Sequence, residues 1–200
     1  MTAIDPTPNR RKALQAAWSL SVVGLWSAMA KANTADYEEK AAWLALRNGG
    51  IALLRHADAP GYGDPPGFSL TDCGTQRNLG ELGRAQAVRI GERFRQQKVK
   101  VGKVLASQWC RTTETAQAAF PGQVEPAAVF NSFFQDRSQA KPQTDMAQAL
   151  LLTWNGTSAL VVVTHQVNIT ALSDIVPASG EGVVLRRVGQ ELRVVGRIRP

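Results

Sequence analysis

The residues best suited to chemistry follow two short apolar segments. Arg55 and His56 come directly after the apolar run at 51–54, and His165, the only other histidine of the chain, follows the run at 160–164. Such runs are typical of buried strands in a parallel sheet, and ligands bind at the carboxyl ends of those strands. The sequence therefore predicts that both imidazoles lie in one crevice.

A second arginine follows another predicted strand by a few residues, at Arg111. Two arginines can hold a phosphate through forked N–H donors. A neutral imidazole can attack phosphorus, and a second imidazole can donate a hydrogen bond to an oxygen that gains charge. Arg55, His56, Arg111 and His165 together favour phosphoryl transfer through a phosphohistidine.

Four segments, in the same order along the chain, resemble the histidine phosphatase superfamily. Residues 54–57 (LRHA) resemble its Arg-His-Gly/Ala signature, and residues 78–87 (NLGELGRAQA) resemble its Leu-x-x-x-Gly-x-x-Gln-Ala segment. Residues 107–116 (SQWCRTTETA) resemble Ser-x-x-x-Arg-x-x-x-Thr-Ala, and residues 162–165 (VVTH) resemble the strand that carries the second histidine. The resemblance covers about residues 50–175.

The resemblance implies a phosphoglycerate-mutase-like fold and a role for each matched residue. His56 would be the nucleophile that becomes phosphorylated, and Arg55, Arg111 and His165 would form the phosphate pocket. It further implies a phosphomonoester hydrolase that works in two steps without metal or cofactor. Hydrolysis is favoured over a mutase reaction, because a chain of 200 residues leaves little room for the insertions that enclose a sugar phosphate.

The family often adds an acidic residue that protonates the leaving oxygen. Asp136, within residues 133–137 (FFQDR), is the best match, and Asp58 is a nearer but less family-like alternative. Arg77, just before a predicted helix, could touch the substrate or serve only a turn.

Predicted strands and helices alternate along the chain. We expect strands at 51–54, 101–106, 127–130, 160–164, 183–188 and 192–198, and helices at 35–46, 79–97, 112–119, 145–154 and 168–175. This order predicts an α/β fold, a three-layer α/β/α sandwich whose central sheet is mostly parallel. A hairpin that turns at 189–190 adds antiparallel edge strands. The segments 59–67 and 131–142 are expected to be loops that flank the crevice and set specificity.

Several other functions are disfavoured by the composition and the residue pattern. The basic residues are scattered rather than interleaved with aromatic residues, so nucleic-acid binding is a poor interpretation of the net charge of +7. Two histidines without a third carboxylate at the usual spacing make a poor zinc site. A non-catalytic module of the same fold that binds phosphate or phosphoglycan remains an alternative to the enzyme.

The two cysteines, Cys73 and Cys110, leave two interpretations open. They could form one disulfide in an exported protein, or they could be two buried thiols. Neither begins a Cys-x5-Arg motif, which argues against thiol-based phosphatase chemistry.

The first 32 residues have the order of an export signal. A basic run at 10–12, with a loose twin-arginine pattern, precedes an uncharged stretch at 13–30 and a small-x-small site at 30–32. We expect cleavage after Ala32, a catalytic domain at 33–200 and a periplasmic location. A retained membrane anchor and a cytosolic amphipathic helix are the alternatives. Without residues 1–32, which hold four basic residues and one acidic residue, the net charge is about +4, which suits anionic partners such as a small phosphorylated substrate or an envelope phosphoglycan.

Overall fold

The computed structural model describes residues 35–199. The chain consists of two compact units, the first ending at Tyr37 and the second beginning at Glu38. The fold described below is that of the second unit, from Glu38 onward. The predicted export signal at 1–32 lies outside the described residues. Within the described part of the chain, no helix is long and apolar enough to cross a membrane.

Six strands form one mixed sheet in the order β3-β2-β4-β1-β5-β6. They are β1 (Ile51–Arg55), β2 (Val101–Ala106), β3 (Val124–Pro126), β4 (Ala159–Thr164), β5 (Gly182–Val188) and β6 (Glu191–Ile198). The first four run parallel, whereas β5 pairs antiparallel with β1 and with β6. The predicted α/β fold is confirmed, with the hairpin on one side of the sheet and β6 at its edge.

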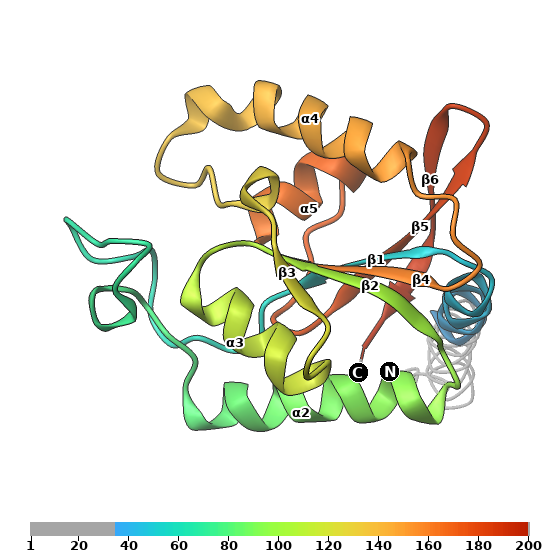
Figure 1. Cartoon of the computed structure of the whole chain (residues 1–200), viewed down its shortest axis with the longest axis horizontal. Coiled ribbons are helices and arrows are strands. Elements are labelled where there is room, and N and C mark those ends of the chain that lie inside the picture. The colour runs from blue at the N-terminus through green and yellow to red at the C-terminus, as the bar shows by residue number, and fades with distance from the viewer. Residues whose placement is uncertain (1–34, 200) are drawn as a thin grey trace, which may run out of the picture. The chain divides into compact units, whose positions relative to one another are not determined.

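Helices cover both faces of this sheet (Figure 1). Helices α2 (Glu81–Gln96) and α3 (Cys110–Ala119) lie on one face, and α4 (Ala140–Leu152) and α5 (Gln166–Ser173) lie on the other. A further helix at 35–47 buries Trp43 against Phe94 of α2. Each face has its own apolar cluster, and both clusters use side chains of the central strands β1 and β4. Because these two strands are covered on both sides, they are apolar at nearly every position.

The structure corrects two of the predicted elements. The strand expected at 127–130 is a 3-10 helix at Ala128–Phe130, and the short strand β3 comes just before it. The helix expected at 145–154 begins five residues earlier, at Ala140, and Pro142 is its third residue. Proline is tolerated in the first turn of a helix because the N–H it lacks has no partner there. The expected loop at 131–142 is therefore shorter and contains a 3-10 helix at Arg137–Gln139.

Candidate functional site

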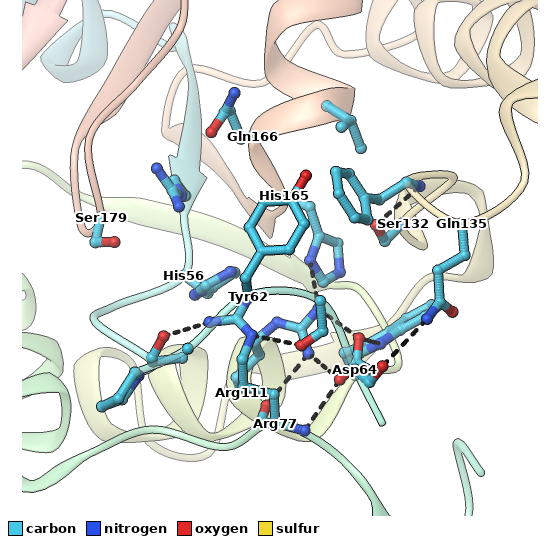
Figure 2. A pocket seen from close by; sticks show the side chains of 18 of the residues that line it. His56, Tyr62, Asp64, Arg77, Arg111, Ser132, Gln135, His165, Gln166 and Ser179 are labelled. Atoms are coloured by element: carbon cyan, nitrogen blue, oxygen red, sulfur yellow. Dashed lines mark hydrogen bonds and ion pairs between the residues drawn. The ribbon is translucent and has the colours of Figure 1, made fainter. Parts of the chain in front are cut away.

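The register of β1 and β4 places the two histidines side by side. Arg55 pairs with Thr164, and the next residues are His56 and His165. The His56 backbone N–H donates to the Thr164 carbonyl at 3.0 Å, which continues the pairing past the ends of the strands. The two rings lie 5.5 Å apart between centroids, nearly edge to face (Figure 2). The predicted meeting of the imidazoles is thus present in the structure.

The ring of His56 is buried and held in one tautomer. Its Nδ1 lies 2.7 Å from the Ala57 carbonyl oxygen, which can only accept, so Nδ1 carries the proton and Nε2 keeps its lone pair. Burial and the nearby charges of Arg111, Arg55 and Arg77 lower the pKa of His56 to about 3, although the bond to Ala57 opposes this shift. The ring is therefore neutral at ordinary pH, which is the form a nucleophilic imidazole requires.

His165 is oriented by a hydroxyl group from the next strand. The Ser107 Oγ lies 2.9 Å from His165 Nε2 and donates its own proton to Asn131 Oδ1. Hence Nε2 is the donor toward Ser107, and Nδ1 is an acceptor 3.4 Å from the Arg111 Nη2 atom. Burial, followed by the neighbouring His56 and Arg111, holds the pKa of His165 well below its usual range.

Arg111 forms a buried two-pronged ion pair with Asp64. Nη1 and Nη2 donate to the two carboxylate oxygens at 2.7 and 3.1 Å, and the two side chains are only 4% and 6% exposed. The remaining Nη protons face the Arg77 carbonyl and His165, whereas Nε has no hydrogen-bond partner in the described part of the chain. Asp64 thus occupies one edge of the guanidinium, and the Nε–H group is the donor left for an anion.

The Asp64 carboxylate is itself held from three sides. It accepts hydrogen bonds from Arg111, from the Arg77 backbone N–H at 3.0 Å and from the Trp109 indole N–H at 3.0 Å. Burial alone would raise the pKa of Asp64, but these hydrogen bonds outweigh it and keep the pKa below its usual value. The residue is therefore a fixed negative charge behind Arg111.

Two further arginines reach the site. Arg55 donates through Nη1 to the Pro177 carbonyl at 3.0 Å, and its buried Nε has no hydrogen-bond partner among residues 35–199. Arg77 donates to the carbonyls of Ala59 and Gly63 and so fastens both ends of the intervening loop. Both side chains line the cavity, and Arg77 also has the predicted role in a turn.

These groups line a cavity of about 560 Å³. The loop at 59–64 and residues 132–137 supply much of its wall, as the sequence predicted for the two flanking segments. Asp58 lies on this wall, whereas Asp136 is absent from the described residues that line it. Asp136 instead caps the 3-10 helix at Arg137–Gln139, and hydrogen bonds from the Ser138 side chain and backbone hold its pKa below the usual value. The structure does not bring Asp136 to the site.

Asp64, Ser107 and Asn131 are functional residues that the sequence reasoning missed. Ser107 is the first residue of the motif at 107–116 that contains Arg111, so its position offered a signal. Asp64 lies in a loop rich in glycine and proline, where nothing in the sequence indicates which cation it meets. In the described residues, no three histidine, cysteine or acidic side chains are grouped so as to hold a metal ion.

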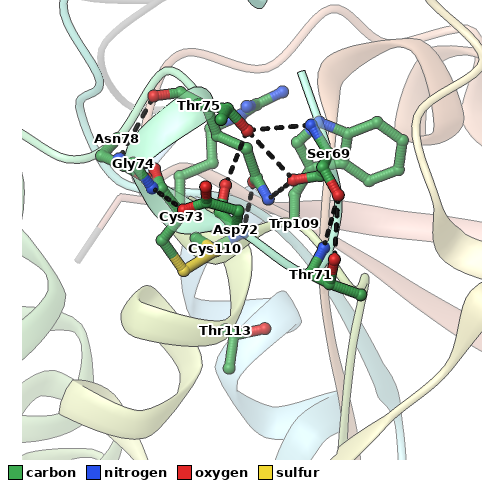
Figure 3. The surroundings of a disulfide bond; sticks show 12 residues. Ser69, Thr71, Asp72, Cys73, Gly74, Thr75, Asn78, Trp109, Cys110 and Thr113 are labelled. Carbon is green, nitrogen blue, oxygen red and sulfur yellow. Dashed lines mark hydrogen bonds between the residues drawn. A yellow bond between two sulfur atoms is a disulfide. The ribbon is translucent and has the colours of Figure 1, made fainter. Parts of the chain in front are cut away.

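A disulfide joins Cys73 to Cys110 beside the site (Figure 3). The bridge links a 3-10 helix at Cys73–Thr75 to the first residue of α3. Arg77 follows one cysteine by four residues, and Arg111 follows the other directly. Of the two interpretations left open by the sequence, the structure has the bridge.

The fold has been seen before in solved structures. No family model and no curated protein matches the sequence. The protein histidine phosphatase SixA complexed with tungstate is 16% identical, with a TM-score of 0.51 over 74% of this chain and 96% of that one. The mycobacterial glucosyl-3-phosphoglycerate phosphatase is also 16% identical, with a TM-score of 0.52 over 73% and 96%. The phosphoserine phosphatase from Entamoeba histolytica is 12% identical, with a TM-score of 0.55 over 76% and 98%.

These similar structures come from the histidine phosphatase superfamily. This chain shares their phosphoglycerate-mutase-like fold.

Proposed function

We propose that this chain, which has the fold of the histidine phosphatases, hydrolyses phosphomonoesters through a phosphohistidine on His56. The observation that carries the proposal is the hydrogen bond from His56 Nδ1 to the Ala57 carbonyl, which leaves the Nε2 lone pair on a buried, neutral ring in a cavity lined by arginines. Phosphatase names among the similar structures, one of them complexed with tungstate, support the same chemistry.

In the first step, His56 Nε2 attacks phosphorus and the bond from phosphorus to the ester oxygen breaks. The ring then carries a positive charge, which the Ala57 carbonyl stabilises through the Nδ1 proton. The Nε–H groups of Arg55 and Arg111, which have no other partner in the described part of the chain, donate to the phosphoryl oxygens and offset their charge. In the second step, water attacks phosphorus, the P–N bond breaks, and His56 regains its lone pair as inorganic phosphate forms.

His165 has to gain a proton at Nδ1 before it can donate to the phosphoryl group. A phosphate monoanion can supply that proton and become a dianion beside the imidazolium. The dianion favours the charged ring, and the Ser107 oxygen accepts from its other N–H. Ser107 and Asn131 are positioning residues for this histidine.

Asp58 replaces Asp136 as the proposed source of the leaving-group proton, because it lines the cavity. Loss of this acid should slow an alkyl phosphate, whose alkoxide needs a proton, much more than p-nitrophenyl phosphate, whose phenolate leaves unaided. D58N should therefore lower kcat for ethyl phosphate selectively, and D136N is the matched control. Equal effects of D58N on both esters would remove Asp58 from the role.

The proposal is tested by hydrolysis of p-nitrophenyl phosphate with the purified protein, with and without EDTA, beside H56A. We expect chelator-resistant turnover that H56A abolishes, and a trapped phosphoenzyme that is labile in acid and stable in base. Loss of wild-type turnover with EDTA would overturn the metal-free mechanism. A folded protein that binds phosphate without turnover would support the binding module instead.

We further propose that the protein is exported and acts on periplasmic phosphate esters or envelope phosphoglycans. The order of charged and apolar residues at 1–32 supports export. The disulfide agrees with it, because such bonds persist in oxidising compartments.

A further inference from the structure

We propose that the cavity takes phosphomonoesters whose alcohol carries a flat apolar ring, with a second negative charge beyond the ring. This inference rests on the proposed function, since it concerns the leaving-group end of the same cavity. It is carried by three side chains at the outer end, Tyr62, Phe134 and Arg137.

The cavity extends well past the groups that would hold a phosphate. Its volume of about 560 Å³ falls in the range of sites that enclose an organic ligand, roughly 300–1,000 Å³. The phosphate end is built from side chains that follow β1, β2 and β4, such as His56, Arg111 and His165. The remaining space is bounded by the loop at 59–64 and by residues 132–137.

An aromatic pair stands at this outer end. Tyr62 is 88% exposed, and its ring meets that of Phe134 edge to face with centroids 5.3 Å apart. Figure 2 shows the Tyr62 ring in front of the two histidines. Gly61 and Gly63 on either side of Tyr62 have φ of +94° and +67°, a backbone shape that presents the ring outward. An exposed ring over a cavity is apolar surface that a flat ligand can cover.

Hydrogen bonds tether the two segments that carry the aromatic pair. Arg77 donates to the carbonyls of Ala59 and Gly63, which brackets Tyr62 within a short tethered loop. Phe134 belongs to the opposite wall, where Gln135 donates to the Asp64 carbonyl at 3.4 Å and connects the two segments. Less backbone therefore has to be ordered when a ligand ring binds, which lowers the entropy cost of binding.

Arg137 supplies a positive charge apart from the phosphate pocket. Its guanidinium carbon lies 5.3 Å from the centre of the Phe134 ring. It belongs to the wall segment 132–137, whereas Arg55, Arg77 and Arg111 are the arginines whose charges act on His56. A guanidinium beside the Phe134 ring can bind a carboxylate or a second phosphate on the same substrate.

A matched series of esters tests the inference. Ethyl phosphate, 2-phenylethyl phosphate and 2-(4-carboxyphenyl)ethyl phosphate all release a primary alcohol, so their chemical steps are nearly the same. The phenyl ring should raise kcat/KM about tenfold over ethyl phosphate, which is the effect of about 1.4 kcal/mol from stacking one ring on an aromatic side chain. The carboxylate should raise it further, by up to about fivefold for a partly exposed ion pair.

Three variants assign the effects to their side chains. Y62L and F134L keep an apolar side chain but remove the ring, and each should lower the ratio of 2-phenylethyl to ethyl phosphate. R137Q should lower only the gain from the carboxylate. Arg95, an exposed arginine in the last turn of α2, provides the control, and R95Q should change none of the ratios.

Binding of the corresponding phosphonates, which cannot be hydrolysed, separates this inference from the proposed function. Ring-dependent phosphonate binding without turnover of any ester would uphold the inference and refute the hydrolase. Turnover that depends on His56 but shows equal kcat/KM for ethyl and 2-phenylethyl phosphate would overturn the inference alone. A ratio that neither Y62L nor F134L lowers would also overturn it.

Discussion

If Arg111 binds the phosphate as proposed, Asp64 limits the part of the guanidinium that the anion can reach. The carboxylate binds one edge of the group, is almost fully buried, and supplies the counter-charge that keeps Arg111 in place when no anion is bound. Removal of one partner of a buried ion pair strongly destabilises the folded protein, because the other charge remains buried without compensation.

Replacement of Asp64 by asparagine should therefore lower the free energy of unfolding by about 3–5 kcal/mol. Saturating inorganic phosphate should stabilise D64N more than the wild type, because the anion restores the missing charge. Urea unfolding with and without phosphate measures both effects. Asp145, which pairs with Lys141 on the surface, gives the control. A D64N protein no less stable than D145N would contradict this role.

The buried neutral state of His56 makes stability depend on pH. The pKa is about 3 in the folded protein and near the ordinary 6.5 in the unfolded chain, so below pH 6.5 the unfolded chain binds the proton first. The neutral His56 ring therefore contributes fully to the free energy of unfolding above pH 6.5. This contribution decreases as the pH falls toward 3, by roughly 1.4 kcal/mol per pH unit between the two pKa values.

The test compares urea unfolding of the wild type and H56Q at pH 7, 6, 5 and 4. We expect the stability of H56Q to fall less steeply below pH 6.5, since the carboxylates are the same in both proteins and His165 remains. Parallel curves for the two proteins would show that His56 is not buried as a neutral ring.

The sequence reveals some site residues and hides others for physical reasons. Arg55, His56 and His165 follow strands whose apolar runs are plain, so the register of the parallel sheet brings them together. Asp64 and Tyr62 reach the cavity only through the path of a loop, which depends on three glycines with positive φ at 61, 63 and 67. No periodicity in the sequence encodes that path.

At the scale of elements, a glycine of helix α2, Gly83, allows the helix to pack closely against the backbone beside the site. A Cβ atom at Gly83 would overlap the backbone carbonyl of Asp58, so the helix packs directly against the chain that follows His56. About two helical turns further along, a Cβ at Gly91 would overlap the Ala119 carbonyl at the end of α3, away from the cavity.

G83A and G91A form a matched pair for this contact. Both should lower the thermal stability, because backbone must shift in each case, and this outweighs the gain of about 1 kcal/mol in helix propensity. Only G83A should lower kcat/KM, because only there does the shift reach Asp58. Thermal unfolding and steady-state kinetics measure the two effects, and wild-type kcat/KM in G83A would contradict the expectation.

The type and the boundaries of an element are predicted wrongly where the local composition fits more than one structure. The run at 127–130 is apolar enough for a strand, but after the short strand β3 it forms a 3-10 helix that buries Phe130. A short buried segment of either kind has the same composition. The early start of α4 was missed because a proline inside a first turn cannot be told from one in a loop by composition alone.

At the scale of the whole molecule, the disulfide links global stability to redox conditions. Closing a loop between Cys73 and Cys110, 37 residues apart, should stabilise the fold by about 2–4 kcal/mol. A reductant should lower the melting temperature of the wild type and leave C73S/C110S unchanged. If export occurs as proposed, protein from the periplasm should begin at residue 33 and contain no free thiol. A reduced, uncleaved chain in the cytoplasm would contradict the proposed location.

The contact between Trp109 and His165 gives the site an optical signal of its own. The indole meets the imidazole edge to face at 5.2 Å, and its N–H is bonded to Asp64. Of the other tryptophans within residues 35–199, Trp43 packs with Phe94 and Trp154 donates to the Gly49 carbonyl, and neither lines the cavity. An oxyanion that binds beside Arg111 and His165 should change the electric field at the Trp109 indole and therefore its fluorescence emission. Binding can then be followed in real time without any label.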